Sequence, residues 1–84
     1  MATILYFAWV RDAVGKGEEV VDIPDHVATV GDLAAFLSAR SEGHARAFAD
    51  LERLRAAVDL AMVGFDASVV GTREIAFFPP VTGG

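Results

Sequence analysis

The chain contains no cysteine in its 84 residues, which excludes disulfide bonds, thiolate metal ligands and catalysis by a side-chain thiol. Basic residues are also scarce. Seven Lys and Arg residues against twelve Asp and Glu residues give a formal net charge of −5, and the bases are scattered along the sequence. Because nucleic-acid binding depends on a concentrated positive surface, this charge balance argues against a nucleic-acid partner.

Long hydrophobic runs are absent as well. No apolar segment approaches the roughly 20 residues that span a bilayer, so we expect no membrane-embedded part. The first ten residues lack the basic start and the cleavage site of a signal peptide, and we therefore expect a cytoplasmic protein. Hydrophobic residues nevertheless make up 54% of the chain. Such a surplus in a single small domain favours an apolar surface that meets a protein partner.

Sequence motifs of catalysis are missing too. Gly15-Lys16-Gly17 lacks the spacing of a phosphate-binding loop, and the chain has neither a Gly-x-Ser-x-Gly motif nor the ligand spacing of a metal site. His26 and His44 stand alone in the sequence, and we interpret each as an ordinary surface or helix-capping residue. No residue is a convincing general base, so the domain is not expected to be an enzyme by itself.

Two strands and a loop are predicted at the N-terminal end. Residues 3–10 (TILYFAWV) are rich in β-branched and aromatic types and apolar on both faces, which predicts a central strand or a strand with one face in an interface. Residues 11–17 are predicted to be a loop, and residues 18–23 a second strand that forms a hairpin with the first. We interpret the acidic residues of this second strand as a solvated edge: Glu18, Glu19 and Asp22.

The clearest helix begins after Thr29. The Thr29 hydroxyl can cap the first turn, with Asp32 in the reciprocal position of a capping box. An apolar stripe at helical spacing follows: Val30, Leu33, Ala34 and Leu37. Gly43 is predicted to end this helix, with Arg40 in its last turn. Residues 44–55 predict a short second helix or a turn.

The C-terminal half resumes strand character. Residues 56–63 predict a strand in which Asp59 either faces solvent or marks a turn, and periodicity leaves both readings open. Residues 64–71 form a glycine-bounded connection with room for a short strand at residues 68–70. Residues 73–78 (REIAFF) are the final strand.

Phe77 and Phe78 end the final strand on opposite faces. Its register with Ile75 places Phe77 in the core. Phe78 is then available to a partner, and we predict that it lies in a protein interface.

The order strand–strand–helix–strand–strand, with one main helix, predicts an α+β fold in which the helix packs across one face of a mixed sheet. The natural architecture is a β-grasp roll with the last strand at its centre. We predict one β-grasp domain over residues 1–78 and an extended C-terminal tail over residues 79–84.

The tail combines stiffness with a bare end. Pro79 and Pro80 cannot donate ladder hydrogen bonds, so they end the strand and favour an extended path. Six extended residues reach at most roughly 20 Å, and Gly83 and Gly84 carry no side chains. Such an arm can present an unhindered α-carboxylate to the active site of another protein. A frayed terminus without a role is the alternative, and physical argument alone leaves both open.

Residues 76–84 (AFFPPVTGG) resemble the C-terminal signature of the small, sulfur-carrier subunits of molybdopterin synthase, a ubiquitin-related family. The similarity extends to Val10-Arg11-Asp12, Thr29-Val30 and Ala56-Ala57-Val58, so it spans nearly the whole chain, although only the tail is highly specific. The family has the β-grasp, ubiquitin-like fold, in agreement with the order of elements predicted above.

Two further points concern the turns of that family. The resemblance implies that Asp59, where the family commonly has Asn, ends a strand before a turn. At Gly71-Thr72-Arg73 this chain departs from the pattern, because relatives usually have a Gly-Asp turn just before the last strand. The departure puts the shape of this loop in doubt, not the tail.

The resemblance implies a covalent role for the terminal carboxylate of Gly84. A carboxylate is a poor electrophile, so an E1-like adenylating enzyme would consume ATP to form a glycyl adenylate. A sulfur donor protein would convert this adenylate into a thiocarboxylate (1-thioglycine), which would give sulfur to the cyclic pyranopterin precursor and form the molybdopterin dithiolene. A sulfur carrier of this kind needs no cysteine, and no cofactor is expected to bind stably.

The implied partner is the large subunit of molybdopterin synthase, which would supply the acid–base residues. The tail would enter a channel of that subunit with Gly84 at its tip, and Phe78 would lie in the interface. The tail residues bound by the channel would be Pro79, Pro80, Val81, Thr82 and Gly83. The family implies a heterotetramer of two small and two large subunits. Two alternatives stay open: a sulfur carrier for thiamin or cysteine synthesis, and a ubiquitin-like modifier of lysine side chains.

Overall fold

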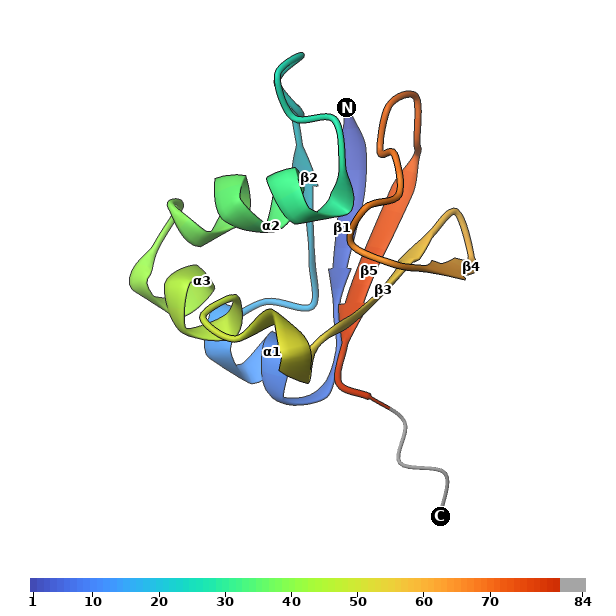
Figure 1. Cartoon of the computed structure of the whole chain (residues 1–84). Coiled ribbons are helices and arrows are strands. Elements are labelled where there is room, and N and C mark those ends of the chain that lie inside the picture. The colour runs from blue at the N-terminus through green and yellow to red at the C-terminus, as the bar shows by residue number, and fades with distance from the viewer. Residues whose placement is uncertain (81–84) are drawn as a thin grey trace.

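The computed structural model describes residues 1–80, which form a mixed five-stranded sheet with helices packed across one face (Figure 1). In chain order the elements are β1 (Ala2–Tyr6), α1 (Ala8–Val14), β2 (Glu18–Val21), α2 (Val30–Ser38), α3 (Glu42–Ala47), the 3₁₀ turn η1 (Leu51–Arg53), β3 (Arg55–Val58), β4 (Ala61–Val63) and β5 (Glu74–Phe78). The strand order is β2-β1-β5-β3-β4, with β1 and β5 parallel and the other neighbours antiparallel. This is the predicted β-grasp roll, with the last strand at its centre.

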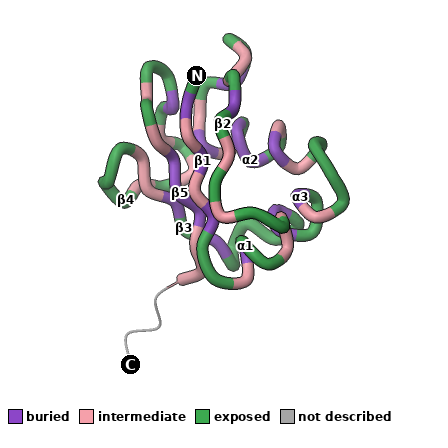
Figure 2. The backbone as a smooth tube through the Cα atoms, turned by 180° about the vertical axis from the view of Figure 1, so that it is seen from behind, coloured by how far each residue is buried: buried purple, intermediate pink, exposed green. Residues whose placement is uncertain are grey.

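The core lies between the helices and one face of the sheet, where the buried residues gather (Figure 2). Burial alternates along β1, whose core-facing residues are Ala2, Ile4 and Tyr6. Phe77 is fully buried, as predicted, and its ring meets Phe48 edge-on with the centroids 4.9 Å apart. Among residues 1–80, no helix has the length and apolar character needed to cross a bilayer.

The predicted capping box at the start of α2 is confirmed. Thr29 Oγ1 accepts a hydrogen bond from the Asp32 backbone N–H at 3.1 Å, and the Asp32 carboxylate accepts one from the Thr29 N–H at 3.2 Å. Hydrogen bonds from the backbone N–H groups of Ala28 and Thr29 hold the pKa of the Asp32 carboxyl below its ordinary value. The stripe predicted for this helix is buried throughout: Val30, Leu33, Ala34 and Leu37.

The prediction of one strand over residues 3–10 followed by a loop is wrong in its second half. β1 ends at Tyr6, and Ala8 adopts a left-handed φ of +53°, which turns the chain into α1. Val10 is thereby fully buried, and Trp9 packs against the same core. The apolar residues of α1 recur one and four positions apart, a spacing that a helix satisfies as well as a strand does.

Gly43 does not end α2, which stops at Ser38 and leaves Arg40 beyond its last turn. Gly43 lies inside α3, where this helix packs against α1. A Cβ atom at Gly43 would overlap the backbone carbonyl oxygen of Ala13. The absence of a side chain at Gly43 therefore allows the two helices to approach closely.

Residues 56–63 form two strands rather than one, because the chain turns at Asp59 and Leu60. Asp59 thus marks a turn, the second of the two readings left open and the one implied by the resemblance. The expected short strand at residues 68–70 is reduced to an isolated bridge between Thr29 and Ser68.

A polar cluster ties α3 to the sheet and overturns two predictions. Glu19 Oε2 accepts a hydrogen bond from the Tyr6 hydroxyl at 2.6 Å and lies 2.7 Å from His44 Nε2, while His44 Nδ1 lies 2.7 Å from Ser41 Oγ. The His44 side chain is 5% exposed and that of Glu19 8% exposed. His44 is therefore no surface residue, and Glu19 does not belong to a solvated edge.

The charge of Glu19 is compensated by its neighbours. Arg40 and Lys16 lie 3.4 Å and 3.7 Å from Glu19 Oε1. Burial alone would raise the pKa of the Glu19 carboxyl, but the hydrogen bonds from Tyr6 and His44 outweigh it and hold this pKa below its ordinary value. Burial and the hydrogen bond to Glu19 raise the pKa of the Tyr6 hydroxyl, so Tyr6 remains a donor.

We predict that Glu19→Gln destabilises the domain at neutral pH by about 1.5–3 kcal/mol, the range for hydrogen bonds to a charged group. Because folding lowers the pKa of Glu19, its contribution is complete above the unfolded value of about 4.3 and is lost as the pH falls through the folded value. The difference in urea midpoint between wild type and Glu19→Gln should therefore shrink below about pH 4. Glu18→Gln, at an exposed position on the same strand, is the control and should leave the midpoint unchanged. A pH-independent difference would contradict this account.

We predict that Gly43→Ala lowers the free energy of unfolding by about 1–3 kcal/mol, the usual cost of overpacking. Alanine stabilises a helix relative to glycine, so Gly43→Ala would raise the free energy of unfolding if Gly43 were an ordinary helical position. The matched control is Gly17→Ala, whose Cβ would meet only the flexible Arg11 side chain, at 3.4 Å or more. Thermal unfolding of wild type, Gly43→Ala and Gly17→Ala measures the difference in stability. A Gly43→Ala variant as stable as wild type would refute the close contact.

Candidate docking surface and tail exit

β5 holds the start of the tail in a fixed place. It pairs with β1 on one edge and with β3 on the other, and the Phe7 N–H donates to the Phe77 carbonyl at 3.2 Å. The strand ends at Phe78, and Pro79 and Pro80 follow as half-buried residues outside any element. Figure 1 shows the chain leaving the sheet at the end beside α1 and η1.

The remaining predicted tail residues lie outside the described part of the chain. They are Val81, Thr82, Gly83 and Gly84. The structure therefore places three of the predicted site residues, Phe78, Pro79 and Pro80, which lie together at the end of the central strand.

The second face of the sheet carries no helix. Figure 2 views the molecule from this side, with β1, β2 and β5 in front of the helices. The strand register shows which residues lie on this open face, because paired residues on neighbouring strands point to the same side of the sheet. Phe78 and Ala76 alternate with the core residue Phe77, so they lie on the open face. Their partners on β3, Arg55 and Ala57, lie there too.

An apolar row crosses four strands of the open face. Leu5 pairs with Ala76, Ala76 with Ala57, and Ala57 with Met62. Met62 is 68% exposed, although methionine is among the types most often buried. This row, together with Phe7 and Phe78, is called the open-face patch below.

Phe7 and Phe78 form the part of the patch nearest the tail. Phe7 keeps an extended backbone (φ −127°, ψ 154°), so the alternation along β1 places its side chain on the open face, where it is 48% exposed. Phe78 is half-buried. The tail therefore leaves the sheet next to two aromatic rings.

Arginines border this end of the molecule. The Arg55 guanidinium donates to the carbonyls of Leu54 at 2.8 Å and Glu52 at 3.3 Å, and Arg53 lies 4.9 Å above the ring of Trp9. Aromatic residues, Met and Arg are the types enriched in protein interfaces. The composition around the tail exit is thus that of a docking surface.

Within residues 1–80 no group of three His, Asp or Glu side chains is arranged to hold a metal ion. The polar cluster of Glu19 and His44 faces the helices, because Glu19 pairs with the core residue Ile4. The open face and the tail exit therefore lie on the other side of the sheet from this cluster.

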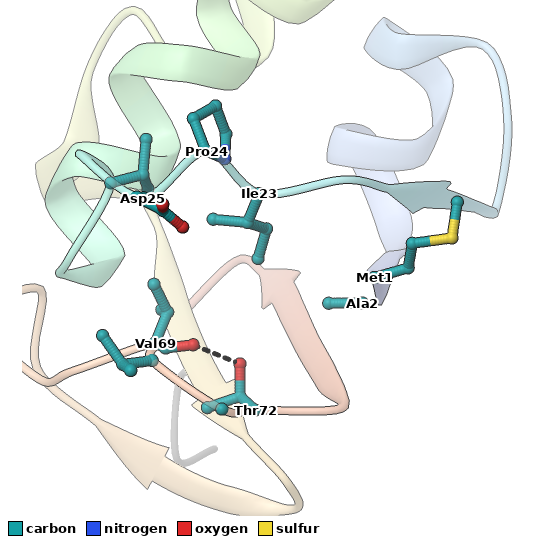
Figure 3. A pocket seen from close by; sticks show the side chains of 10 residues that line it. Met1, Ala2, Ile23, Pro24, Asp25, Val69 and Thr72 are labelled. Carbon is teal, nitrogen blue, oxygen red and sulfur yellow. Dashed lines mark hydrogen bonds between the residues drawn. The ribbon is translucent and has the colours of Figure 1, made fainter.

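A separate hollow of about 210 Å³ lies at the N-terminal end of β1, away from the tail (Figure 3). None of the predicted site residues lines it. Here Gly71 takes a left-handed φ of +74°, and the Thr72 hydroxyl donates to the Val69 carbonyl at 2.8 Å. The loop before β5, where this chain lacks the Gly-Asp pair of the family, thus closes through Gly71 and Thr72.

Sequence reasoning found part of the open-face patch. It placed Phe78 in an interface, and it left open that the first strand, in which Leu5 and Phe7 alternate with Ile4 and Tyr6, has one face in an interface. Met62 could not be found in this way, because its face depends on the turn at Asp59 and Leu60, which periodicity left undecided.

Comparison with known proteins agrees with the fold. Two solved structures superpose on almost the whole chain. SAMP1 from Haloferax volcanii has a TM-score of 0.64 and 23% identity and covers 99% of this chain and 98% of its own. A putative molybdopterin converting factor, subunit 1, from Pyrococcus furiosus has a TM-score of 0.63 and 22% identity and covers 95% and 97%. The fold therefore defines the protein as a β-grasp domain.

The sequence comparisons are more specific. The ThiS family matches residues 4–84, so the chain belongs to the ThiS family. The molybdopterin synthase sulfur carrier subunit of Escherichia coli K12 is 42% identical over 86 residues, and that of Haemophilus influenzae is 31% identical over 84 residues. Each alignment covers 100% of both chains.

Proposed function

We propose that this chain is the sulfur-carrier subunit of a molybdopterin synthase. The observation that carries the proposal is the 42% identity, over the full length of both chains, to a protein of that name. The exit of the tail beside the open-face patch agrees with it, because a carrier must dock on a partner while its C-terminus reaches the partner's active site.

The proposed chemistry takes place at Gly84. A carboxylate oxygen attacks the α-phosphorus of ATP on an E1-like adenylating enzyme and releases pyrophosphate. The terminal sulfur of a persulfide on a donor protein then displaces AMP and forms an acyl disulfide. A second thiol cleaves the S–S bond by forming a disulfide with the donor, which leaves a thiocarboxylate at Gly84. ATP is thus consumed by the activating enzyme, and the carrier itself needs no bound cofactor.

The second stage takes place on the large subunit. The thiocarboxylate sulfur attacks a carbon of the cyclic pyranopterin precursor and displaces an oxygen substituent from it. Water then cleaves the resulting thioester, which leaves the sulfur on the pterin and restores the carboxylate of Gly84. Two successive carriers supply the two sulfurs of the dithiolene. The residues from Pro79 to Gly83 occupy a channel of the large subunit. Pro79 and Pro80 reduce the entropy lost when the tail is ordered, and glycines fit a narrow passage.

The open-face patch is proposed as the surface that meets the large subunit, with Phe78 at its end near the tail. Burial of an aromatic side chain beside Arg55 is typical of the residues that dominate interface energies. Two copies of each subunit form a heterotetramer in the cytoplasm.

We predict that Gly84 exchanges one oxygen for sulfur when the chain is incubated with ATP, the adenylating enzyme and the sulfur donor. Intact mass spectrometry measures the change, and a chain lacking Gly83 and Gly84 is the control. A chain that binds the adenylating enzyme but never acquires sulfur would sink the proposal. Co-purification with a thiazole synthase would favour the thiamin alternative, and lysine-linked conjugates that require Gly83 and Gly84 would favour a protein modifier.

We predict that Phe78→Ala raises the Kd for the large subunit by about 10- to 100-fold, because an aromatic anchor beside the tail is lost. Isothermal titration calorimetry measures the affinity, and circular dichroism verifies that the variant is folded. Val70→Ala is the matched control, since Val70 is 73% exposed and lines the hollow at the other end of the molecule. Unchanged affinity of Phe78→Ala would show that the open face is not the docking surface.

A further inference from the structure

The turn between β3 and β4 is built from two residues with left-handed backbones. Asp59 has φ +46° and Leu60 has φ +74°, and they join Val58 to its partner Ala61. Two-residue hairpin turns with two positive φ values favour Asn-Gly or Asp-Gly, since other residues adopt this backbone at a steric cost. A leucine in the second position is therefore unusual.

Contacts within the domain explain why Asp59 adopts a left-handed backbone in this turn. Asp59 Oδ1 accepts hydrogen bonds from the backbone N–H groups of Arg73 and Glu74, both at 3.0 Å, and its own N–H donates to the Glu74 carbonyl at 2.9 Å. These bonds fix the turn to the start of β5. Asn and Asp also tolerate the left-handed region better than other side chains do.

Nothing comparable explains Leu60 among the described residues. Leu60 is 89% exposed, so burial of its side chain does not offset the steric cost of its backbone. An exposed leucine is ordinary by itself, but the left-handed backbone of Leu60 costs stability that burial of its side chain does not recover. A residue with such a cost and no internal gain is a candidate for an external contact.

Leu60 also continues the open-face patch. It lies two residues before Met62, the last member of the apolar row, on a hairpin that projects from the body of the molecule in both views (Figures 1 and 2). An open hollow of about 300 Å³ lies beside it, between the turn and the start of β5. Phe78 ends β5 at the other end, so Leu60 and Phe78 flank the patch.

The strands themselves offer a small face. Five strands about 4.8 Å apart and five residues at about 3.3 Å each give roughly 400 Å² in projection. Phe7 at the tail end and Leu60 at the hairpin end extend the apolar surface beyond the strands, and both side chains are exposed.

We propose that Leu60 is a specificity-determining contact for the same protein that receives the tail, the large subunit, and that it enters an apolar pocket there. This inference rests on the proposed function. Contacts at Phe78 and Leu60 hold the carrier at both ends of β5, so the domain cannot pivot while the tail enters its channel. Leu60 is kept in a strained, exposed position because the partner recognises it.

The test is Leu60→Gly, measured for both stability and affinity. Glycine adopts φ +74° without strain, so the Tm should rise by about 2–6 °C, while the Kd for the purified large subunit should rise by about 5- to 20-fold. Leu60→Met keeps an apolar side chain and should retain most of the affinity. Val70→Gly, at a position outside the patch that is 73% exposed, should leave the Kd unchanged.

Each other result overturns the inference. If Leu60→Gly binds as tightly as wild type while Phe78→Ala binds weakly, Leu60 is no contact and the proposed function stands. If neither change weakens binding, docking through the open face is wrong as well. If Leu60→Gly lowers the Tm, Leu60 stabilises the fold itself, and its position needs no partner to explain it.

Discussion

The pairing of β5 on both of its edges is the constraint on which the rest of the structure depends. Between β1 and β3 the strand has its ladder partners on either side, and Phe77 anchors it in the core. Pro79 and Pro80 then prevent the ladder from continuing. The tail consequently starts from a rigid position in the middle of the sheet rather than from a frayed edge, which is the geometry that precise delivery of a terminal group requires.

The two faces of the sheet have separate tasks. The helix-covered face holds β5 through its core and through the cluster of Tyr6, Glu19 and His44. The other face carries an apolar row that is buried at Ala76 and exposed at Met62, with an aromatic pair beside the tail and a strained leucine at the far turn. In the proposed function the reactive carboxylate belongs to the backbone, so the side chains need only position the domain.

Local sequence signals predicted the features that depend on neighbouring residues. The Thr29–Asp32 capping box, the apolar stripe of α2, the core position of Phe77 and the stop at Pro79 each follow from a few consecutive positions and simple stereochemistry. The β-grasp order followed from the sequence of elements, and the comparison with known proteins confirms the fold. The role of Gly84 came from resemblance, because no physical rule distinguishes a reactive terminus from an idle one.

Features that depend on tertiary contact could not be predicted in this way. Residues 8–10 continue the apolar run of the first strand and residues 11–14 read as a loop, and only the left-handed Ala8 and the packing of α1 against α3 show that they form a helix. Gly43 resembles a helix stop until the carbonyl of Ala13 is seen beside it. Glu19 and His44 are separated by 25 positions, so the sequence shows an acidic edge and an isolated histidine where the structure has a buried hydrogen bond.

The most direct measurement of the central claim is the conversion of the cyclic pyranopterin precursor by the purified large subunit, supplied with this chain in its thiocarboxylate form. The account predicts that the dithiolene of molybdopterin forms and that the chain returns with a plain carboxylate at Gly84. A stable complex of the two proteins that leaves both the precursor and the thiocarboxylate unchanged would contradict it.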